Sequence, residues 1–497
     1  MQPPVRKAEQ ASIFTLHGMT YGAAAFYVCA AISAFALALF APNAAFAGDA
    51  SHELGATYSL LWILPFAGLL LSIAAFPLAA QSFWHHHYGK IALFWALSFV
   101  VPFWVTFGTT HMAEAILHAA LLEYIPFIIL IGSLYTIAGG IFISGNLHGS
   151  PEVNTAILAI GTVLASFVGT TGASIILIRP LLRANDDRGH NVHAIVFFIF
   201  LVSNIGGSLT PLGDPPLFLG FLKGVDFFWP FEHMLSPTLI LVVILLTLFY
   251  VIDTYIYRKE GHSRPDPTPD APLRVRGVLN IALLFALLCA VLASGLLTGL
   301  GEVNILGTHV PVAGLLRDGT LVLLALASLF LSPQANRHAN NFNWEPVLEV
   351  AKLFAAIFIT IIPAIAILQS GEKGALAPML EVLTNADHSP NNTAYFWMTG
   401  LLSSFLDNAP TYLIFFNSAG GDPIDLQGPL VNTLLAVSAG AVYMGAMTYI
   451  GNAPNFMVKS IAEHHGVPMP SFFGYIGWSV IFLVPAFALI TFIFFLS

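Results

Sequence analysis

Apolar runs about 20 residues long recur along almost the whole chain, and they constrain its fold more than any other feature. An α-helix needs a run of this length to cross a hydrocarbon layer roughly 30 Å thick. Charged residues make up only 9% of the sequence, whereas an ordinary soluble domain contains about 25%. The sequence therefore predicts an all-α polytopic membrane protein, with the lipid bilayer as its surroundings.

Net charge and motif spacing exclude several classes of function. With a net charge of −9 and only 17 Lys and Arg residues, the chain has no basic field to attract nucleic acid. No Ser/Lys, Asp/Asp protease or zinc-binding spacing occurs in the apolar runs. We therefore expect neither an enzyme nor a bound cofactor.

The first 47 residues form a separate segment. A short basic region precedes an apolar stretch, and Ala45-Phe46-Ala47 before Gly48 resembles a small-residue cleavage site. The segment is expected to be a signal peptide or an extra N-terminal helix.

The remaining chain divides into two halves, residues 48–256 and 277–497, that share one plan. Each half is expected to contain three spans, a re-entrant hairpin, a broken span and a last span. The hairpins and broken spans are expected at residues 155–178, 192–223, 393–416 and 430–459. Five crossings is an odd number, so the second half must enter the membrane the opposite way round. The sequence predicts two inverted-topology repeats, a plan common among secondary transporters.

The distribution of positive charge gives the orientation. When the polar, proline-rich linker 257–276 is placed in the cytoplasm, most Lys and Arg residues fall on the same side. The chain is then predicted to be a multi-pass protein of the cell (inner) membrane with a cytoplasmic linker.

One segment of the first half combines helix breakers with an acid. Ser203–Phe221 holds four glycines, three prolines and Asp214 between apolar runs. Within it, TPLGDPPLF (Thr210–Phe218) aligns with TYIGNAPNF (Thr448–Phe456) of the second half. Non-helical backbone at membrane depth is tolerated only where protein or water covers it. These two segments are therefore expected to line a polar site near the midplane.

The tips of the hairpins are expected at the same depth. TTGAS (Thr170–Ser174) aligns with LDNAPT (Leu406–Thr411), with Ala173 opposite Ala409. Neither Lys nor Arg occupies any of the four motifs, whereas two carboxylates do, which suits cations. Burial and a neighbouring carboxylate both favour the protonated form of a carboxyl group, so such a group can exchange a proton for Na⁺. The predicted ion or substrate ligands are Asp214, Asp407, Asn408, Thr171, Ser174, Asn204, Thr210, Thr411, Thr448 and Asn452, with Asp214 and Asp407 as the Na⁺ ligands. Alternatively, either aspartate only caps a half-helix.

With these motifs, TTGASIILIRPLLRAN, SNIGGSLTPLGDPPLFLGF, LDNAPT and GNAPN, the chain resembles the ion-transporter superfamily. The most similar branch is that of sodium/proton antiporters and citrate carriers; arsenite permeases and dicarboxylate carriers are related. The resemblance implies inverted repeats, hairpin tips that form the site, and a homodimer. Dicarboxylate carriers have Ser-Asn-Thr at both tips, whereas this chain has Thr-Gly-Ala-Ser and Asp-Asn-Ala-Pro.

The sequence thus favours a secondary transporter that exchanges Na⁺ or Li⁺ for H⁺ by alternating access. The alternative is a carrier of citrate or another small anion coupled to Na⁺ or H⁺. Arsenite efflux is a third hypothesis, weakened by the absence of cysteine from the four motifs.

Overall fold

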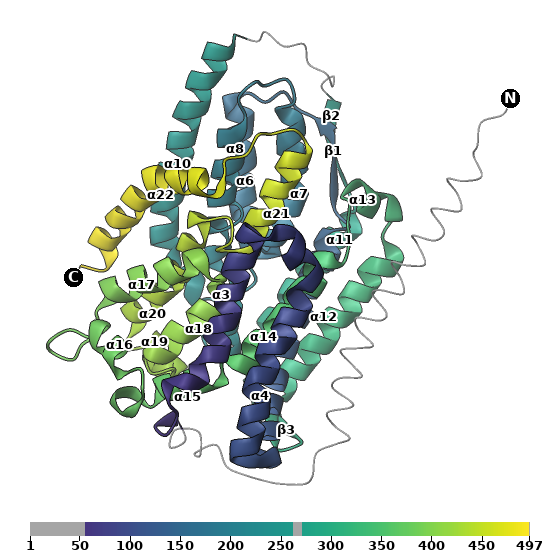
Figure 1. Ribbon diagram of the computed structural model, residues 1–497. Coiled ribbons are helices and arrows are strands. Elements are labelled where there is room, and N and C mark those ends of the chain that lie inside the picture. Colours follow the sequence, from purple (N-terminus) through teal and green to yellow (C-terminus); the bar gives the residue numbers. More distant parts are fainter. Residues whose placement is uncertain (1–54, 262–270, 497) are drawn as a thin grey trace.

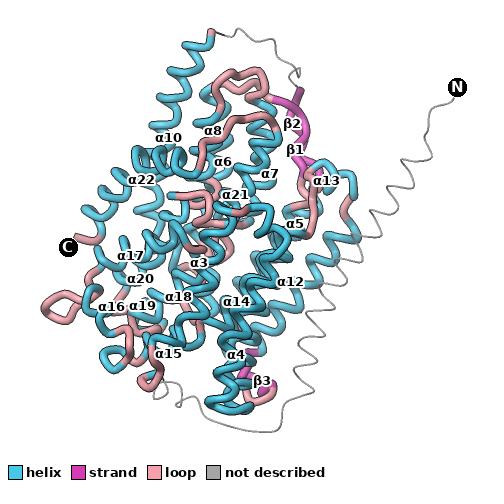
Figure 2. Tube along the Cα trace, in the orientation of Figure 1, coloured by secondary structure: helices cyan, strands magenta, loops and turns pink. Residues whose placement is uncertain are grey.

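The computed structural model describes residues 55–261 and 271–496, and most of them are helical (Figure 1, Figure 2). Residues 1–47 and part of the linker lie outside the described residues. Within the described ranges, eight helices are long and apolar enough to cross a membrane. A ninth is added when Glu345–Thr360 and Ile362–Gln369, bent by 41°, count as one span. The expectation of an all-α polytopic membrane protein is confirmed.

The helices of the first half follow the expected order. They are η1 (Leu60–Ile63), α3 (Leu64–Ala79), α4 (Gln81–Ala119), the π-helical turn η2 (Ala120–Tyr124), α5 (Ile125–Ala138), α6 (Pro151–Val168), α7 (Thr170–Ala184), α8 (Val192–Leu201), η3 (Ile205–Leu209), α9 (Pro215–Leu222) and α10 (Trp229–Glu260). Helix α4 is interrupted at Gly108, whose φ is 84°. This interruption divides α4 into two helical segments.

The second half repeats the order with several additional short helices between its longer ones. Its helices are α11 (Val278–Leu296), η4 (Thr298–Leu300), α12 (Val312–Leu331), α13 (Gln334–Ala339), α14 (Glu345–Thr360), α15 (Ile362–Gln369), η5 (Gly371–Lys373), α16 (Ala377–Val382), α17 (Asn392–Phe405), α18 (Asn408–Ser418), α19 (Pro423–Gln427), α20 (Val431–Met444), η6 (Gly445–Met447), α21 (Ala453–His464) and α22 (Phe472–Phe494). The expected hairpins correspond to α6–α7 and α17–α18, and the expected broken spans to α8–η3–α9 and α20–η6–α21.

Two short antiparallel sheets join loops. β1 (Phe142–Asn146) pairs with β2 (Ala271–Arg276), so the end of the linker lies against the segment after α5. β3 (Glu302–Ile305) and β4 (Thr308–Pro311) form a hairpin between α11 and α12.

The helices pack in two groups, and each group draws on both halves of the chain (Figure 1). We call α3, α4, α5, α11, α12 and α14 the frame helices, since each packs extensively on others of the set. The core helices are α6 to α10, α17, α18 and α20 to α22. Helix α21 lies beside α7 and α8, and α18 lies beside α9, so the two halves interlock within the core group.

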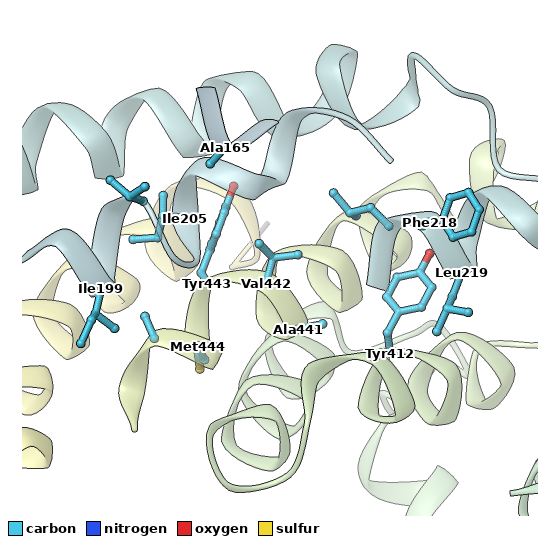
Figure 3. Close-up of a cluster of buried hydrophobic side chains, with 14 of the residues drawn as sticks. Ala165, Ile199, Ile205, Phe218, Leu219, Tyr412, Ala441, Val442, Tyr443 and Met444 are labelled. Carbon is cyan, nitrogen blue, oxygen red and sulfur yellow. The ribbon is translucent and has the colours of Figure 1, made fainter. Parts of the chain in front are cut away.

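Apolar side chains fill the contact between the broken spans. Figure 3 shows Ile199 and Ile205 on one side and Val442, Tyr443 and Met444 on the other. Every residue of α8 except Val192 is buried, which explains why the helix is apolar apart from His193. The Tyr443 hydroxyl lies 2.7 Å from Thr238 Oγ1 on α10. The broken spans are therefore held inside protein, as exposed backbone at membrane depth requires.

The two halves repeat the same contacts. The Thr210 hydroxyl donates to the Ser166 carbonyl and the Thr448 hydroxyl to the Ser404 carbonyl, with 44 residues between donor and acceptor in both. Corresponding residues of the two hairpins are therefore separated by the same number of positions as corresponding residues of the two broken spans. Ala173 therefore corresponds to Thr411, two residues from the expected pairing with Ala409. The opposite orientation of the halves in the membrane remains a prediction.

Close backbone approaches fix both breaks. A Cβ at Gly213 would lie 2.1 Å from the Gly207 carbonyl oxygen, and one at Gly451 would lie 2.5 Å from that of Gly445. Only glycine leaves room for the two backbone segments to approach each other at these positions.

We predict that Gly213→Ala and Gly451→Ala each destabilise the protein, because the methyl group meets backbone that cannot rotate away. Overpacking of this kind costs about 1–3 kcal/mol. The measurement is the thermal unfolding midpoint of detergent-purified protein. Gly477→Ala on α22 is the control, since its Cβ would meet nothing within 4 Å. Equal midpoints for all three variants would contradict this description of the breaks.

Candidate functional site

The Asp214 side chain lies at the centre of the core helices and is 1% exposed. Asp214 is the N-cap residue of α9, and two prolines follow it. Proline is favoured at the first helical position because its missing N–H has no partner there in any case. The sequence Gly-Asp-Pro-Pro thus starts a new helix at this point and directs the carboxylate into the protein.

Three neutral groups from three other helices donate hydrogen bonds to this carboxylate. Thr170 Oγ1 donates to Oδ1 over 3.0 Å, and Asn452 Nδ2 donates to Oδ1, also over 3.0 Å. Asn408 Nδ2 donates to Oδ2. Thr170 belongs to the first hairpin, whereas Asn408 and Asn452 come from the second half. The expected meeting of both tips and both broken spans is therefore visible at one carboxylate.

Each of these residues stands at the start of a helix. Thr170 and Asn408 are the first residues of α7 and α18. Asn452 is the N-cap residue of α21 and lies 238 positions after Asp214, the N-cap residue of α9. Four helix N-termini, two from each half, therefore converge on the Asp214 carboxylate. Helix N-termini carry partial positive charge, so this arrangement favours negative charge at the point of convergence.

The second predicted acid has a different environment. Asp407 is the N-cap residue of α18, and its Oδ1 accepts a hydrogen bond from the Ala409 N–H over 3.1 Å. Its side chain is partly exposed. Among the described residues, no hydrogen bond joins it to Asp214. The geometry thus agrees with the alternative that Asp407 caps a half-helix. Asp407 is also the sequence neighbour of Asn408, which contacts Asp214.

The predicted hydroxyl ligands lie around the site and bond mainly to backbone. Besides the Thr210 and Thr448 contacts, Thr411 Oγ1 donates to the Asp407 carbonyl of its own helix over 3.1 Å. Ser174 Oγ lies 2.9 Å from Ser203 Oγ. Thr171 lines a cavity beside Asp214. Thr210, Thr448 and Ser174 thus hold the hairpins against the broken spans, and across the described residues none of the five hydroxyls bonds to the Asp214 carboxylate.

Two buried amide oxygens accept no hydrogen bond from the described part of the chain. They are Oδ1 of Asn204 and Oδ1 of Asn408. The Nδ2 group of Asn204 donates to the Ile199 carbonyl over 2.8 Å and to Asn455 Oδ1 over 2.7 Å. Buried polar atoms usually have a partner. These oxygens are therefore available to a further hydrogen-bond donor or to a cation.

Asn455 was absent from the predicted ligands, although it belongs to the aligned motif TYIGNAPNF. Its Nδ2 donates to the carbonyls of Gly445 and Thr448, 2.8 and 2.9 Å away. It thus satisfies backbone freed by the break and holds Asn204 in place. A second asparagine three residues after Asn452 was the available signal. Thr170 was also absent from the predicted ligands, although its neighbour Thr171 was included. Thr170 contacts Asp214 because it is the first residue of α7.

A small cavity of about 60 Å³ adjoins the carboxylate. It lies between α5 and the α7 and α9 segments that carry Thr170 and Asp214. A single water needs at least about 10–15 Å³, so a few waters or a bare ion fit. Across the described residues, no group of three or more His, Cys, Asp or Glu side chains could hold a metal ion.

We predict that Asp407→Ala lowers the thermal unfolding midpoint, because it leaves the Ala409 N–H without its side-chain acceptor. Loss of an N-cap costs about 1 kcal/mol. Asp407→Ser, which can also cap, should retain most of the stability in the same measurement. If the alanine and serine variants unfold at the same temperature, the side chain does not act as a cap.

Several known proteins are similar to this chain. A 46 kDa membrane protein of Mycobacterium leprae is 23% identical over 328 residues, covering 65% of this chain and 72% of that protein. An uncharacterized transporter of Synechocystis is 24% identical over 340 residues, covering 63% and 70%. An uncharacterized transporter of Mycobacterium tuberculosis is 24% identical over 335 residues, covering 65% and 72%. Residues 55–495 match the family model described as "Putative citrate transport". The chain belongs to this family and is a membrane transporter rather than an enzyme.

Proposed function

We propose that this transporter carries a citrate-like carboxylate across the membrane together with a cation. The observation that most supports this proposal is the convergence of four helix N-termini on the Asp214 carboxylate. The family description also favours the carboxylate over the exchange of Na⁺ or Li⁺ for H⁺. Cation exchange therefore becomes the second candidate.

The balance of charge at the site supports a carboxylate substrate. Each helix N-terminus is equivalent to about +0.5 elementary charge, so four of them supply about +2. The carboxylates of Asp214 and Asp407 supply a charge of about −2 when both are ionised. In a site that only bound cations, the four positive helix ends would serve to keep the aspartates ionised. A site that bound a carboxylate would need them, because Asp214 already occupies the centre.

The net charge of the site, which is close to zero, also explains why a cation should accompany the substrate. A carboxylate that entered alone would add negative charge beside Asp214, in surroundings where unpaired charge is costly. The oxygens of Asn204 and Asn408 accept no hydrogen bond from the described residues, and amide oxygens are suitable ligands for Na⁺. We infer that these oxygens and the Asp214 carboxylate hold Na⁺, or that Asp214 takes up H⁺.

The volume beside Asp214 constrains the transport cycle. The cavity of about 60 Å³ admits an ion or a few waters but not citrate. The proposal therefore requires α5 to separate from α7 and α9 before a carboxylate binds. A buried site that opens by movement of helices is what alternating access demands.

The second candidate is supported by a different observation. In the described part of the chain, the hydrogen bonds to Asp214 come from two amides and one hydroxyl, and not from Lys or Arg. A carboxylate without a cationic partner can bind Na⁺, Li⁺ or H⁺ in turn. Under this alternative, the cation crosses without any carboxylate.

The proposal includes the predicted arrangement in the membrane. The halves 48–256 and 277–497 are taken as inverted repeats, with the linker 257–276 on the cytoplasmic side of the inner membrane. A homodimer, implied by the family resemblance, is part of the proposal.

We predict that proteoliposomes take up labelled citrate when an inward Na⁺ or H⁺ gradient is imposed. Asp214→Asn should reduce the initial rate, because it removes the ionised acceptor of three hydrogen bonds. Hydrogen bonds to charged groups are worth about 1.5–3 kcal/mol, so the loss should be on the order of tenfold to a hundredfold. Asp226→Asn, which changes an exposed aspartate outside the site, is the control.

The same vesicles separate the two candidates when a preset pH gradient is monitored. Collapse of that gradient on addition of NaCl or LiCl, with no citrate present and no citrate uptake, would replace the proposal with cation exchange. Wild-type citrate uptake by well-folded Asp214→Asn protein would remove Asp214 from the mechanism.

A further inference from the structure

A groove of about 660 Å³ lies between the frame helices α4 and α14, away from Asp214. The residues that line it are polar at one end and apolar along the remainder. One end is formed by the basic or titratable side chains His85, His86, Lys90 and Lys352. The remainder is formed by the apolar residues Ala92, Leu93, Ala96, Ala355, Ala356 and Ile359.

The two lysines of the groove have no carboxylate partner. In the described chain, the ion-paired lysines are Lys223 and Lys459. The Lys352 ammonium lies 5.2 Å from the centre of the Tyr88 ring, a distance at which a cation and an aromatic face attract. Its stem lies across Gly89, where an added Cβ would be 3.3 Å from Cδ. Packing thus holds this unpaired charge at the groove.

The acids near this end of the groove are already engaged. Glu345 Oε1 lies 3.4 Å from His85 Nε2. Glu349 Oε1 accepts a hydrogen bond from Trp84 Nε1 over 3.1 Å. Within the described chain, neither acid forms an ion pair with Lys90 or Lys352, so both lysines can meet an anion from outside the chain.

The direction of the groove identifies the kind of anion. The lining residues on α4 run from His85 to Ala96, a rise of roughly 16 Å at about 1.5 Å per residue. The cations lie near the starts of α4 and α14, and the apolar residues lie farther along both helices. A free phosphate would use only the charged end. A second copy docked symmetrically on the groove would bring two sets of the same lysines together.

We propose that this groove binds an anionic phospholipid. The headgroup phosphate contacts Lys90 and Lys352, with His85 and His86 at the rim, and one acyl chain lies along the alanine-rich floor. Basic pockets between membrane helices hold anionic headgroups in this way. The bound lipid joins α4 to α14 and stabilises the frame helices, whatever substrate the core helices carry.

The test uses full-length protein in detergent, titrated with phosphatidylglycerol or with phosphatidylcholine, with the thermal unfolding midpoint as readout. Phosphatidylglycerol should raise the midpoint and phosphatidylcholine should not. The double variant Lys90→Gln, Lys352→Gln should need more phosphatidylglycerol for the same shift, on the order of tenfold or more. A matched double variant, Arg258→Gln with Lys259→Gln at the exposed end of α10, should respond like the wild type.

Several outcomes would overturn the lipid site. Equal shifts from both lipids, or an unchanged phosphatidylglycerol response in the Lys90, Lys352 variant, would each do so. A full shift from inorganic phosphate alone would assign the lysines to a soluble anion. Conversion of a dimer to a monomer by the same variant, with no change in lipid response, would assign the groove to a second copy. Single variants Lys90→Gln and Lys352→Gln keep the test decisive if the double variant fails to fold.

Discussion

A carboxylate buried among the core helices is the constraint on which the rest of the structure depends. Asp214 is removed from solvent, and an unpaired charge in such a place would cost many kcal/mol. Its partners, Thr170, Asn408 and Asn452, come from helices that start where Asp214 does. Helices can start in mid-membrane only if spans are broken or turn back. The hairpins, the broken spans and the glycines between them follow from bringing four helix N-termini to one point.

The site is shared between the halves of the chain, which limits how it can open. Asp214 and Thr170 belong to the first half, and Asn408 and Asn452 to the second. A movement that separated α7 and α9 from α18 and α21 would leave buried donors and a buried charge without partners. The helices that carry the four groups must therefore move together. The contact of α5 with α7 and α9 is apolar, and the cavity beside Asp214 lies there. Opening this contact costs less free energy, because it leaves no buried charge without a partner.

The sequence predicted the fold well where one physical rule dominated. Apolar run length located the spans, and Gly and Pro located both breaks. The alignment of Asp214 with Asn452 was correct because the two broken spans share a motif. The hairpins lacked such a motif, so Ala173 was paired with Ala409, although contacts of Ser166 and Ser404 pair it with Thr411. The residue at which α7 begins determines whether Thr170 or Thr171 contacts Asp214. Two adjacent threonines in the sequence do not show which of them that is. The cap formed by Asp407 was among the alternatives, but its distance from Asp214 could come only from three-dimensional contacts.

The most direct test of a shared carboxylate and cation site is reciprocal binding to the purified protein. Citrate affinity is measured at several Na⁺ concentrations and several pH values, and Na⁺ affinity is measured with and without citrate. Coupled binding predicts that citrate and its cation each tighten the other by the same factor, as linkage requires. Citrate affinity that is independent of both Na⁺ and pH, or Na⁺ affinity unchanged by citrate while Na⁺ drives transport, would contradict a shared site at Asp214.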